Sequence, residues 1–267
     1  MSREKPQLLS LSAHNALLAG ISKERLRILA SRCRMLEMES GSVLHEWGQP
    51  IRHLYFPIDA VISLFASSPD GGLIEAAIVG CEGVIGWPAA ISQSKFCFRA
   101  VTHVRGTIVQ VEESAIQKIF YQERSWRLIV AAYIHVFTIQ LAQSAICNNQ
   151  HSVERRLARW LMATKARTGL TLFPITHELL SEILGTIRPV VTVAARSLKK
   201  KRLIHYQRGN LTITNPAGLA NAACSCYDVV HGELGAFLML CKFTSHPFLR
   251  GPGLALPRTE KGRDEKR

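Results

Sequence analysis

The stretch from Leu179 to Ile204, LLSEILGTIRPVVTVAARSLKKKRLI, contains two apolar-striped segments that meet at Gly185. Thr176 is suited to cap the first segment, because its hydroxyl can accept a hydrogen bond from a backbone N–H of the first turn. The apolar face of that segment is Leu179, Leu180, Ile183 and Leu184. Glycine tolerates the left-handed backbone that a sharp turn requires. The stretch therefore predicts two helices joined by a tight turn.

The second segment has one apolar side and one basic side. Pro189 fits the first turn of a helix, where its missing N–H costs nothing. The predicted buried face consists of Val190, Val191, Ala194, Ala195 and Leu198. The side left to solvent carries Arg188, Thr192, Arg196, Lys199 and Lys200. HYQRGNLTITN follows, and its Arg208-Gly209-Asn210 centre predicts a β-hairpin. Together these features indicate a winged helix-turn-helix.

A helix that enters the major groove places its early residues against base edges. Arg188 is the candidate for a bidentate contact to guanine, and Pro189 and Thr192 could add apolar or hydroxyl contacts. The remaining candidates are expected to meet phosphates. They are Thr176, His177, Arg196, Lys199, Lys200 and Arg208. The basic run that starts at Lys199 has a second interpretation as a solvated helix C-terminus, where cations are favourable, and both can hold.

The charge is concentrated in this part of the chain. The protein has 267 residues, an apolar fraction of 47%, and a formal charge of +13. Residues 155–208 contain 12 Lys and Arg but 2 Asp and Glu, whereas residues 1–124 contain 13 and 12. The apolar fraction is sufficient for a folded core. The asymmetry predicts two domains, of which the basic one binds a polyanion.

Seven cysteines, no CxxC and no secretory signal indicate reduced thiols in a cytoplasm. Cys224 and Cys226 are closer in sequence than the usual zinc ligands. Cys147 and His151 are four residues apart and could share a ligand on an unbroken helix, but a structural pair is the favoured interpretation. The sequence thus predicts no metal site.

Residues 128–153 contain no charged side chain. Length alone would permit a membrane span, but polar residues from His135 onward argue against one. Spacings of four and three connect a coiled-coil-like seam of Trp126, Val130, Tyr133, Phe137, Gln140 and Ser144, continued at Cys147. We expect a long helix that pairs with its own copy in a homodimer. The alternative is a helix whose seam is buried within one subunit.

The fold class expected from these patterns is α+β. The first 40 residues have a helical pattern, and residues 41–112 contain short β-rich runs between turn signals such as PDGG at 69–72. We predict an antiparallel, jelly-roll-like β-roll in residues 1–122, a dimerisation helix in 123–150 and a winged helix-turn-helix domain in 151–230. A final helix from about Ala217 should pack on the DNA-binding domain, and residues 249–267 should form a disordered tail.

This order of elements resembles the Crp/Fnr family of bacterial transcription regulators over about residues 20–230. The segment ITHELLSEILGTIRPVVTVAARSLKKKRLIHYQRGNLTI is similar to the family's DNA-binding signature. The resemblance implies a cyclic-nucleotide-binding-like β-roll and a homodimer that controls transcription at two-fold symmetric DNA sites, with RNA polymerase as a further partner. The family commonly has an Arg-Glu pair near the start of its recognition helix. Pro189 replaces that acid, and Val193 stands where a second basic residue often lies, so a different DNA preference is expected.

The ligand pocket implied by the resemblance departs further, in VGCEGVIGWPAAISQSKFCFRAV. Gly86 matches the family's ribose-binding pair, but Trp87 replaces the acid. The phosphate-binding arginine has its place near Phe96, with Lys95 and Arg99 as displaced candidates. A missing carboxylate and a missing cation would leave a nucleotide unpaired, so a cyclic nucleotide is not expected. No cofactor is predicted, since Cys33 alone cannot supply the N-terminal cysteine group of iron–sulfur members.

Common catalytic signatures, among them the P-loop, GxSxG and HExxH, are missing from the sequence. Glu82 and His103 are best interpreted as surface or satisfied core residues. We therefore predict a cytoplasmic, sequence-specific DNA-binding regulator that is not an enzyme and does not associate with a membrane. The sequence is compatible both with gating by an unidentified signal in the β-roll and with a constitutive regulator whose amount alone sets its output. The alternative is a membrane-associated or ligand-binding protein without DNA function.

Overall fold

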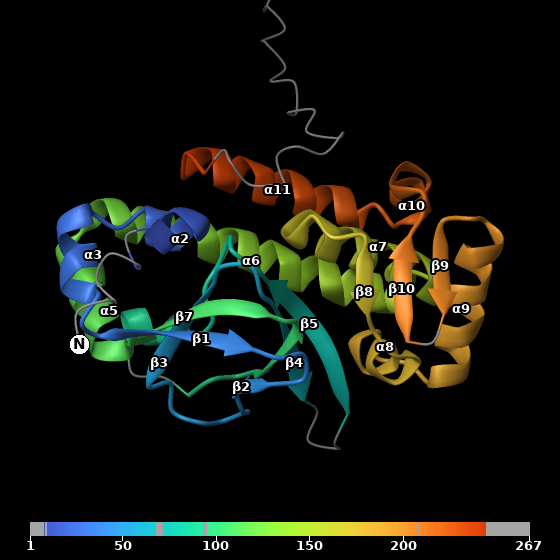
Figure 1. The fold of residues 1–267 in the computed structure, drawn as a ribbon, viewed down its shortest axis with the longest axis horizontal. Coiled ribbons are helices and arrows are strands. Elements are labelled where there is room, and N and C mark those ends of the chain that lie inside the picture. The colour runs from blue at the N-terminus through green and yellow to red at the C-terminus, as the bar shows by residue number, and fades with distance from the viewer. Residues whose placement is uncertain (1–7, 9, 68–71, 93–94, 208, 244–267) are drawn as a thin grey trace, which may run out of the picture.

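The structure is a computed structural model that describes residues 8, 10–67, 72–92, 95–207 and 209–243. A β-roll lies at one end, a compact helical unit with a small sheet lies at the other, and the long helix α6 runs between them (Figure 1). Mixed helices and antiparallel sheets confirm the expected α+β class. Most of the PDGG turn, Arg208 and the predicted tail at 249–267 lie outside the described residues.

The N-terminal helical region is shorter than the sequence pattern predicts. It contains η1 (Ser12–His14), α2 (Ala16–Ala19) and α3 (Lys23–Leu29), and strand β1 then begins at Cys33. The expected helical character therefore holds to residue 29 rather than 40. Asn15 anchors the region, because its buried amide accepts from the backbone of Leu17 and donates to the carbonyls of Pro57 and Gly83.

Two antiparallel sheets form the β-roll, with strand orders β1-β7-β3 and β2-β6-β4-β5. Their bounds are β1 Cys33–Met38, β2 Val43–His45, β3 His53–Pro57, β4 Val61–Ser67, β5 Leu73–Val79, β6 Arg99–Val104 and β7 Gly106–Glu112. The short helix α4 (Pro88–Ile91) separates β5 from β6, and α5 (Glu113–Gln122) leads to α6 (Arg124–Gln150). The predicted β-rich region thus forms a roll, to which Cys33–Met38 adds a strand.

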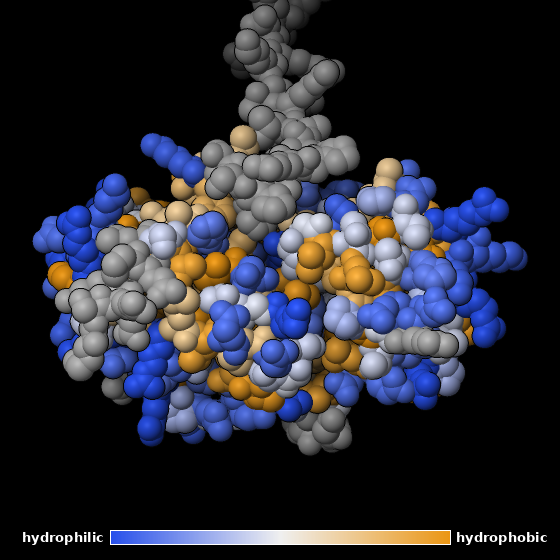
Figure 2. Space-filling model, in the orientation of Figure 1, coloured by the Kyte–Doolittle hydropathy of each residue, from blue (hydrophilic) through white to orange (hydrophobic). Residues whose placement is uncertain are grey.

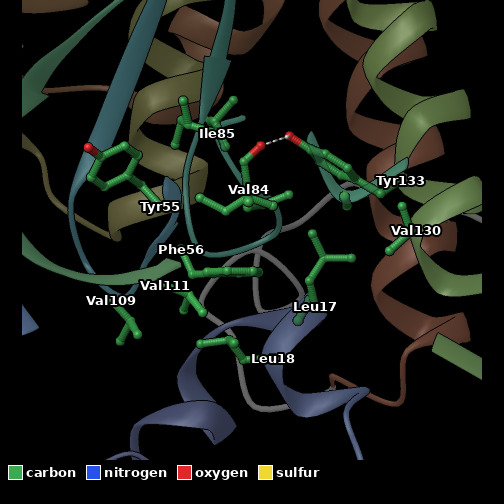
Figure 3. Packing of buried hydrophobic residues seen from close by; sticks show 14 of the residues in the cluster. Leu17, Leu18, Tyr55, Phe56, Val84, Ile85, Val109, Val111, Val130 and Tyr133 are labelled. Atoms are coloured by element: carbon green, nitrogen blue, oxygen red, sulfur yellow. Dashed lines mark hydrogen bonds between the residues drawn. The ribbon is translucent and has the colours of Figure 1, made fainter. Parts of the chain in front are cut away.

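The core of this half joins the sheets, α2 and α6. Leu17 and Leu18 point from α2 toward Phe56 and Val111 of the sheet (Figure 3). From the other side, the Tyr133 hydroxyl of α6 donates to the carbonyl of Val84 at 3.2 Å. Burial of large aromatic and branched side chains is the main stabilising term of such a core.

The predicted dimer seam on α6 lies inside this core, so that prediction is wrong. Its six side chains are all buried within the chain: Trp126, Val130, Tyr133, Phe137, Gln140 and Ser144. Trp126 donates from Nε1 to the carbonyl of Leu17 at 2.9 Å, and Gln140 donates from Nε2 to that of Ile78 at 3.1 Å. The alternative of burial within one subunit is correct for this face. The bulky residues of α6 cover the β-roll, because they bury the most apolar area there.

The second half begins with α7 (Val153–Thr168). It continues with β8 (Leu172–Pro174), α8 (His177–Ile183), α9 (Arg188–Lys200), β9 (Ile204–Gln207), β10 (Asn210–Ile213) and α10 (Pro216–Ala222). The three strands form one antiparallel sheet in the order β8-β10-β9. The predicted helix-turn-helix and its hairpin wing are therefore confirmed as structural elements.

The last helix among the described residues, α11 (Cys226–Leu240), leaves this unit and returns beside α6 (Figure 1). Leu234, Phe237 and Leu238 belong to the core that contains the β-roll and α6. A final helix that packs on the DNA-binding domain is thus correct for α10, which contacts α7, and only partly correct for α11, which contacts α7 but packs mainly on α6. The predicted limit at residue 230 falls within α11.

Candidate nucleic-acid interface

The turn between α8 and α9 has the geometry that the sequence predicts. The Thr176 hydroxyl caps α8 by accepting from the backbone N–H of Leu179 at 3.2 Å. Gly185 has a φ of +54°, in the left-handed region. A Cβ at Gly185 would stand 2.7 Å from Cδ1 of Ile74 on β5, so a side chain there would also require Ile74 to shift. Pro189 lies in the first turn of α9, as expected.

Helix α9 buries one side and presents the other to solvent. The buried side consists of Val191, Ala194, Ala195 and Leu198. Val190, predicted to join them, is 38% exposed, which corrects that assignment. The exposed row at helical spacing is Arg188, Pro189, Val193, Arg196 and Lys200. Hydrophilic side chains cover much of the surface at the end of the molecule that contains α9 (Figure 2).

Two apolar residues interrupt the basic surface. Ile187 is 66% exposed just before α9, and Val193 is 65% exposed in the middle of its free side. An apolar side chain at such a position suits contact with a thymine methyl group. The sequence marked Val193 as a departure from the family's basic residue, but no pattern distinguished Ile187 from a core residue.

Arg188 is held in place by an exposed ion pair. Its Nη1 lies 3.0 Å from Oε1 of Glu178, and the two side chains are 65% and 58% exposed. An exposed pair of this kind stabilises by about 0–1 kcal/mol, so a stronger partner can displace Glu178. The pair orients the guanidinium at the start of α9, and the guanidinium can still exchange Glu178 for a stronger partner.

His177 and Thr192 are half-buried and have hydrogen-bond partners within the chain. His177 Nδ1 lies 3.0 Å from the Thr192 hydroxyl, and its ring stacks on Tyr206 of the wing with centroids 4.5 Å apart. Burial, followed by the charge of Arg188, lowers the pKa of His177, so the ring favours its neutral form. Thr192 also donates to the carbonyl of Arg188 at 3.0 Å. These contacts lock α8, α9 and the wing together.

The end of α9 is tied to its surroundings by lysines. Lys199 Nζ donates to the carbonyl of Tyr206 at 3.5 Å, a weak contact with the wing. Lys201 pairs with Glu154 of α7 at 2.5 Å. Lys200 and Arg196 are exposed on the free side. The described phosphate candidates therefore divide into cations that face solvent, Thr176 at a helix cap, and His177, which is half-buried against Thr192 and Tyr206.

A second free surface runs along α6, opposite its buried seam. Its members are all exposed and follow one another at spacings of three and four: Leu128, Ala131, His135, Thr138, Ala142, Ala145 and Asn149. We call this row the outer face of α6. This face carries no charge when His135 is neutral. Its side chains are mostly small, which permits close approach of a second helix.

The four ligand-pocket candidates do not converge on one site. Gly86 has a φ of +85° before α4. Trp87 packs edge-on against Phe137 of α6, which also contacts Phe98. Lys95 is exposed, and Arg99 Nε pairs with Glu46 at 3.2 Å. Aromatic side chains thus occupy the neighbourhood of Trp87, while Lys95 faces solvent and Arg99 is paired with Glu46.

A buried polar network joins the β-roll to α7. The Ser63 hydroxyl donates to Glu75 at 2.5 Å, and Trp160 Nε1 of α7 donates to the same carboxylate at 3.3 Å. Burial raises the pKa of Glu75 to about 7, which the two donors oppose. His103 lies 2.8 Å from Ser63, and burial, followed by the charge of Arg167, lowers its pKa to about 3.

A buried ion pair lies next to this network. Arg167 Nε of α7 is 2.7 Å from Oε1 of Glu82, and both side chains are at most 5% exposed. Arg167 also donates to Gln140 of α6 at 3.4 Å. The interpretation of Glu82 and His103 as satisfied core residues is therefore supported. Three parts of the chain, the β-roll, α6 and α7, meet at these groups.

Helix α6 is long and apolar enough to cross a membrane by length and composition. Its buried seam, however, covers the β-roll and α11. Core helices share this length and composition, so these two properties alone are weak evidence for a membrane span.

Residues 155–222 match the family model of the Crp-like helix-turn-helix domain. No curated protein sequence matches the chain. A structure from Eubacterium rectale described as a transcriptional regulator of the Crp/Fnr family matches with a TM-score of 0.61 and 14% identity, covering 76% of this chain and 94% of that one.

FixK2 from Bradyrhizobium japonicum matches with a TM-score of 0.61 and 13% identity, covering 72% of this chain and 98% of its own. A CRP-family transcriptional regulator from Thermus thermophilus gives 0.60 and 16%, with coverage of 70% and 96%. At these identities the likeness establishes the shared fold, and the domain match establishes the helix-turn-helix. Residues 155–222 thus form a Crp-like helix-turn-helix domain, and the chain shares the fold of structures described as Crp/Fnr-family or CRP-family transcriptional regulators.

Proposed function

We propose that this protein binds two-fold symmetric duplex DNA as a homodimer, with α9 of each subunit in a major groove. The observation that carries the proposal is the free side of α9, where Arg188, Arg196 and Lys200 are exposed around Val193. A helix with this combination can neutralise phosphates at its flanks and contact bases near its start.

The assignment of contacts follows from the partners of each side chain. Arg188, held by a weak exposed ion pair, is the reader of guanine. Val193 and Ile187 are suited to thymine methyl groups. Arg196, Lys199 and Lys200 contact phosphates, whereas His177 and Thr192 position α9 through their contact with each other.

The homodimer forms through the outer face of α6, since the bulky seam is already used within the subunit. Pairing two copies of this uncharged row would place the two α9 helices on the same side of the dimer, about one turn of DNA apart. The uncharged composition of α6, which also suits a membrane, is explained by one face buried in the chain and one face buried in the dimer.

We place the regulator in the bacterial cytoplasm, with RNA polymerase as a further partner and without a catalytic role of its own. A signal at the β-roll would act through α6 and the Glu82–Arg167 joint to α7. Such a signal shifts the population between two orientations of the DNA-binding unit. The packing of Trp87 and Phe98 against Phe137 of α6 favours a signal other than a cyclic nucleotide.

Selection of binding sites from a randomised duplex library tests this proposal. We expect the wild-type chain to enrich an inverted repeat, and Arg188→Ala to lose or relax one base position in each half-site. Arg34→Ala removes an equal charge from an exposed position on β1 and should enrich the wild-type sequence. An Arg188→Ala protein that enriches the same sequence with the same stringency would contradict the assignment of α9 as the reading helix.

A further inference from the structure

Four potential metal ligands meet where α6 ends and α11 begins. They are Cys147, His151, Cys224 and Cys226, which we call the joint cluster. One ligand atom from each lies within 4.8 Å of those from all the others. The Sγ atoms of Cys147 and Cys224 are 3.4 Å apart, and Cys226 Sγ is 3.6 Å from His151 Nδ1.

The joint cluster is a buried and separate feature of the fold. Cys147, Cys224 and Cys226 are 0%, 1% and 3% exposed and form a cluster distinct from the two larger cores. All three are free thiols. Cys147 and Cys224 are 77 residues apart in sequence, so the fold, and not local chain geometry, brings them together. Packing alone does not require three sulfur atoms and an imidazole nitrogen to converge on one point.

The spacing of these atoms fits a single ion. A tetrahedral zinc site with bonds of about 2.3 Å to sulfur separates its ligand atoms by roughly 3.8 Å. The observed 3.4 and 3.6 Å are close to this value. A cluster with several irons spreads its cysteines further apart, because each iron binds only some of them. Three cysteines and one histidine are also a known composition of closed structural zinc sites.

We propose that the joint cluster binds one zinc ion as a closed tetrahedral site. Zinc with three thiolates and a neutral imidazole carries a net charge of −1. Arg159 of α7 interacts electrostatically with all three thiols, and its buried Nε finds no acceptor among the described residues. The guanidinium therefore supplies the balancing charge beside the site.

The position of the site gives the ion a mechanical role. Cys147 lies in the last turn of α6, and His151 caps that helix immediately before Ser152, the N-cap of α7. Cys224 and Cys226 lie at the entry to α11, which packs on α6. The ion would thus fasten the α6–α7 joint to α11 and limit the orientations of the DNA-binding unit, a consequence for DNA that rests on the proposed function.

The sequence spacing of the four ligand residues does not predict this site. Cys224 and Cys226 are separated by one residue, and the other two ligands form an i, i+4 pair on a distant helix end. Each pair alone favours a structural interpretation, and only the return of α11 to α6 joins the two pairs. The expectation of no metal site is therefore replaced by this proposal.

Metal content of the full chain tests the proposal without DNA. Reduced protein, loaded with zinc and freed of excess, should contain one zinc per chain. Cobalt in its place should give the absorption of thiolate-coordinated tetrahedral cobalt. We expect Cys226→Ser to weaken zinc affinity by more than about 100-fold, beyond the usual effect of an outer-shell change. Cys97→Ser, at an exposed position of the β-roll, should bind zinc as the wild type does.

Three results would overturn the assignment. They are no zinc retained by reduced wild-type protein, equal affinity in wild type and Cys226→Ser, and purification with iron and sulfide in place of zinc. Should Cys226→Ser fail to fold, as judged by circular dichroism, His151→Asn at the partly exposed helix cap provides the same test. None of these measurements involves DNA, so a negative result for zinc binding would leave the proposed DNA-binding function untouched.

Hydrogen exchange on the same samples tests the fastening role. Zinc should slow amide exchange in the last turn of α6 and the first turn of α11 together, relative to the metal-free reduced protein. Unchanged rates in both segments would show that the ion does not join them.

Discussion

Helices α6 and α9 are built alike but have opposite free surfaces. Each buries one side within its own chain: Trp126 and Tyr133 for α6, Val191 and Leu198 for α9. The free side of α9 is basic, whereas the outer face of α6 is uncharged and mostly small. We propose that in each case the partner is specified by what remains after the chain has formed its own core, a polyanion for α9 and a second copy for α6.

The largest effect should come from a charge on the outer face of α6. Ala142→Glu would place two carboxylates between the paired outer faces of α6, where desolvation and like charge both oppose association. We expect a monomer in sedimentation experiments. Affinity for the full DNA site should fall by roughly 10²–10⁴-fold, because the two half-sites are no longer bound together.

Ala217→Glu on α10 is the matched control, since this alanine is also exposed on a helix. It should leave the dimer intact. A stable dimer in Ala142→Glu would show that the subunits associate through another surface.

The buried network between the two halves should give a pH-dependent effect on stability. The pKa of Glu75 in the folded state is about 7, above its ordinary value of 4.5. A raised pKa means that stability present below pH 4.5 is lost as pH rises through 7. Glu75→Gln should abolish this loss, which amounts to roughly 3 kcal/mol in the free energy of unfolding.

His103 acts in the opposite sense. Its pKa is lowered to about 3, so its contribution is lost as pH falls from 6.5 toward 3. The two windows overlap between pH 4.5 and 6.5 with opposite signs, so the wild-type profile shows only their sum. Denaturation curves of wild type and Glu75→Gln at pH 4 to 5 and at pH 7 to 9 are therefore compared, and the difference between the two proteins isolates Glu75. Glu39→Gln, at an exposed position, should keep the wild-type profile. A Glu75→Gln protein with the wild-type profile would contradict the role assigned to Glu75.

Arg188→Ala should have an intermediate effect, on DNA alone. Loss of a bidentate guanine contact costs about 1–3 kcal/mol, or roughly 10- to 100-fold in affinity, at one position of each half-site. Competition with duplexes altered at that base pair measures the change. Uniform weakening across all sequences would instead indicate a phosphate contact.

Lys200→Gln should have the smallest effect, and it distinguishes phosphate contacts from base contacts. Removal of one phosphate contact lowers the slope of log affinity against log salt by about 1 per subunit while leaving sequence preference intact. Titrations at several salt concentrations measure the slope. A changed base preference would show that Lys200 contacts bases rather than phosphates.

The two helices also differ in how far sequence could predict them. In α9 the contrast between apolar and basic residues identifies the buried side, and the error is confined to Val190, which the first turn leaves exposed. Residues 128–153 carry no charge, so α6 has two rows with the same spacing. The bulkier row suggested a dimer seam, but bulk is what the β-roll core requires. Periodicity alone could not choose between an intrachain and an interchain partner.

Features that depend on distant parts of the chain were the least predictable. The winged helix-turn-helix follows from local signals, namely the Thr176 cap, Gly185 and Pro189. The return of α11 to α6, the pairing of Glu82 with Arg167 and the joint cluster each join segments more than 70 residues apart. No local pattern encodes such contacts.

The mass and affinity of the protein–DNA complex test the central claim most directly. The full chain would be bound to the selected inverted-repeat duplex and to a duplex of equal length with one half-site scrambled. We predict two chains on the intact duplex and binding at least about 100-fold weaker to the scrambled one. A single bound chain with equal affinity for both duplexes would contradict recognition by an α6-linked dimer.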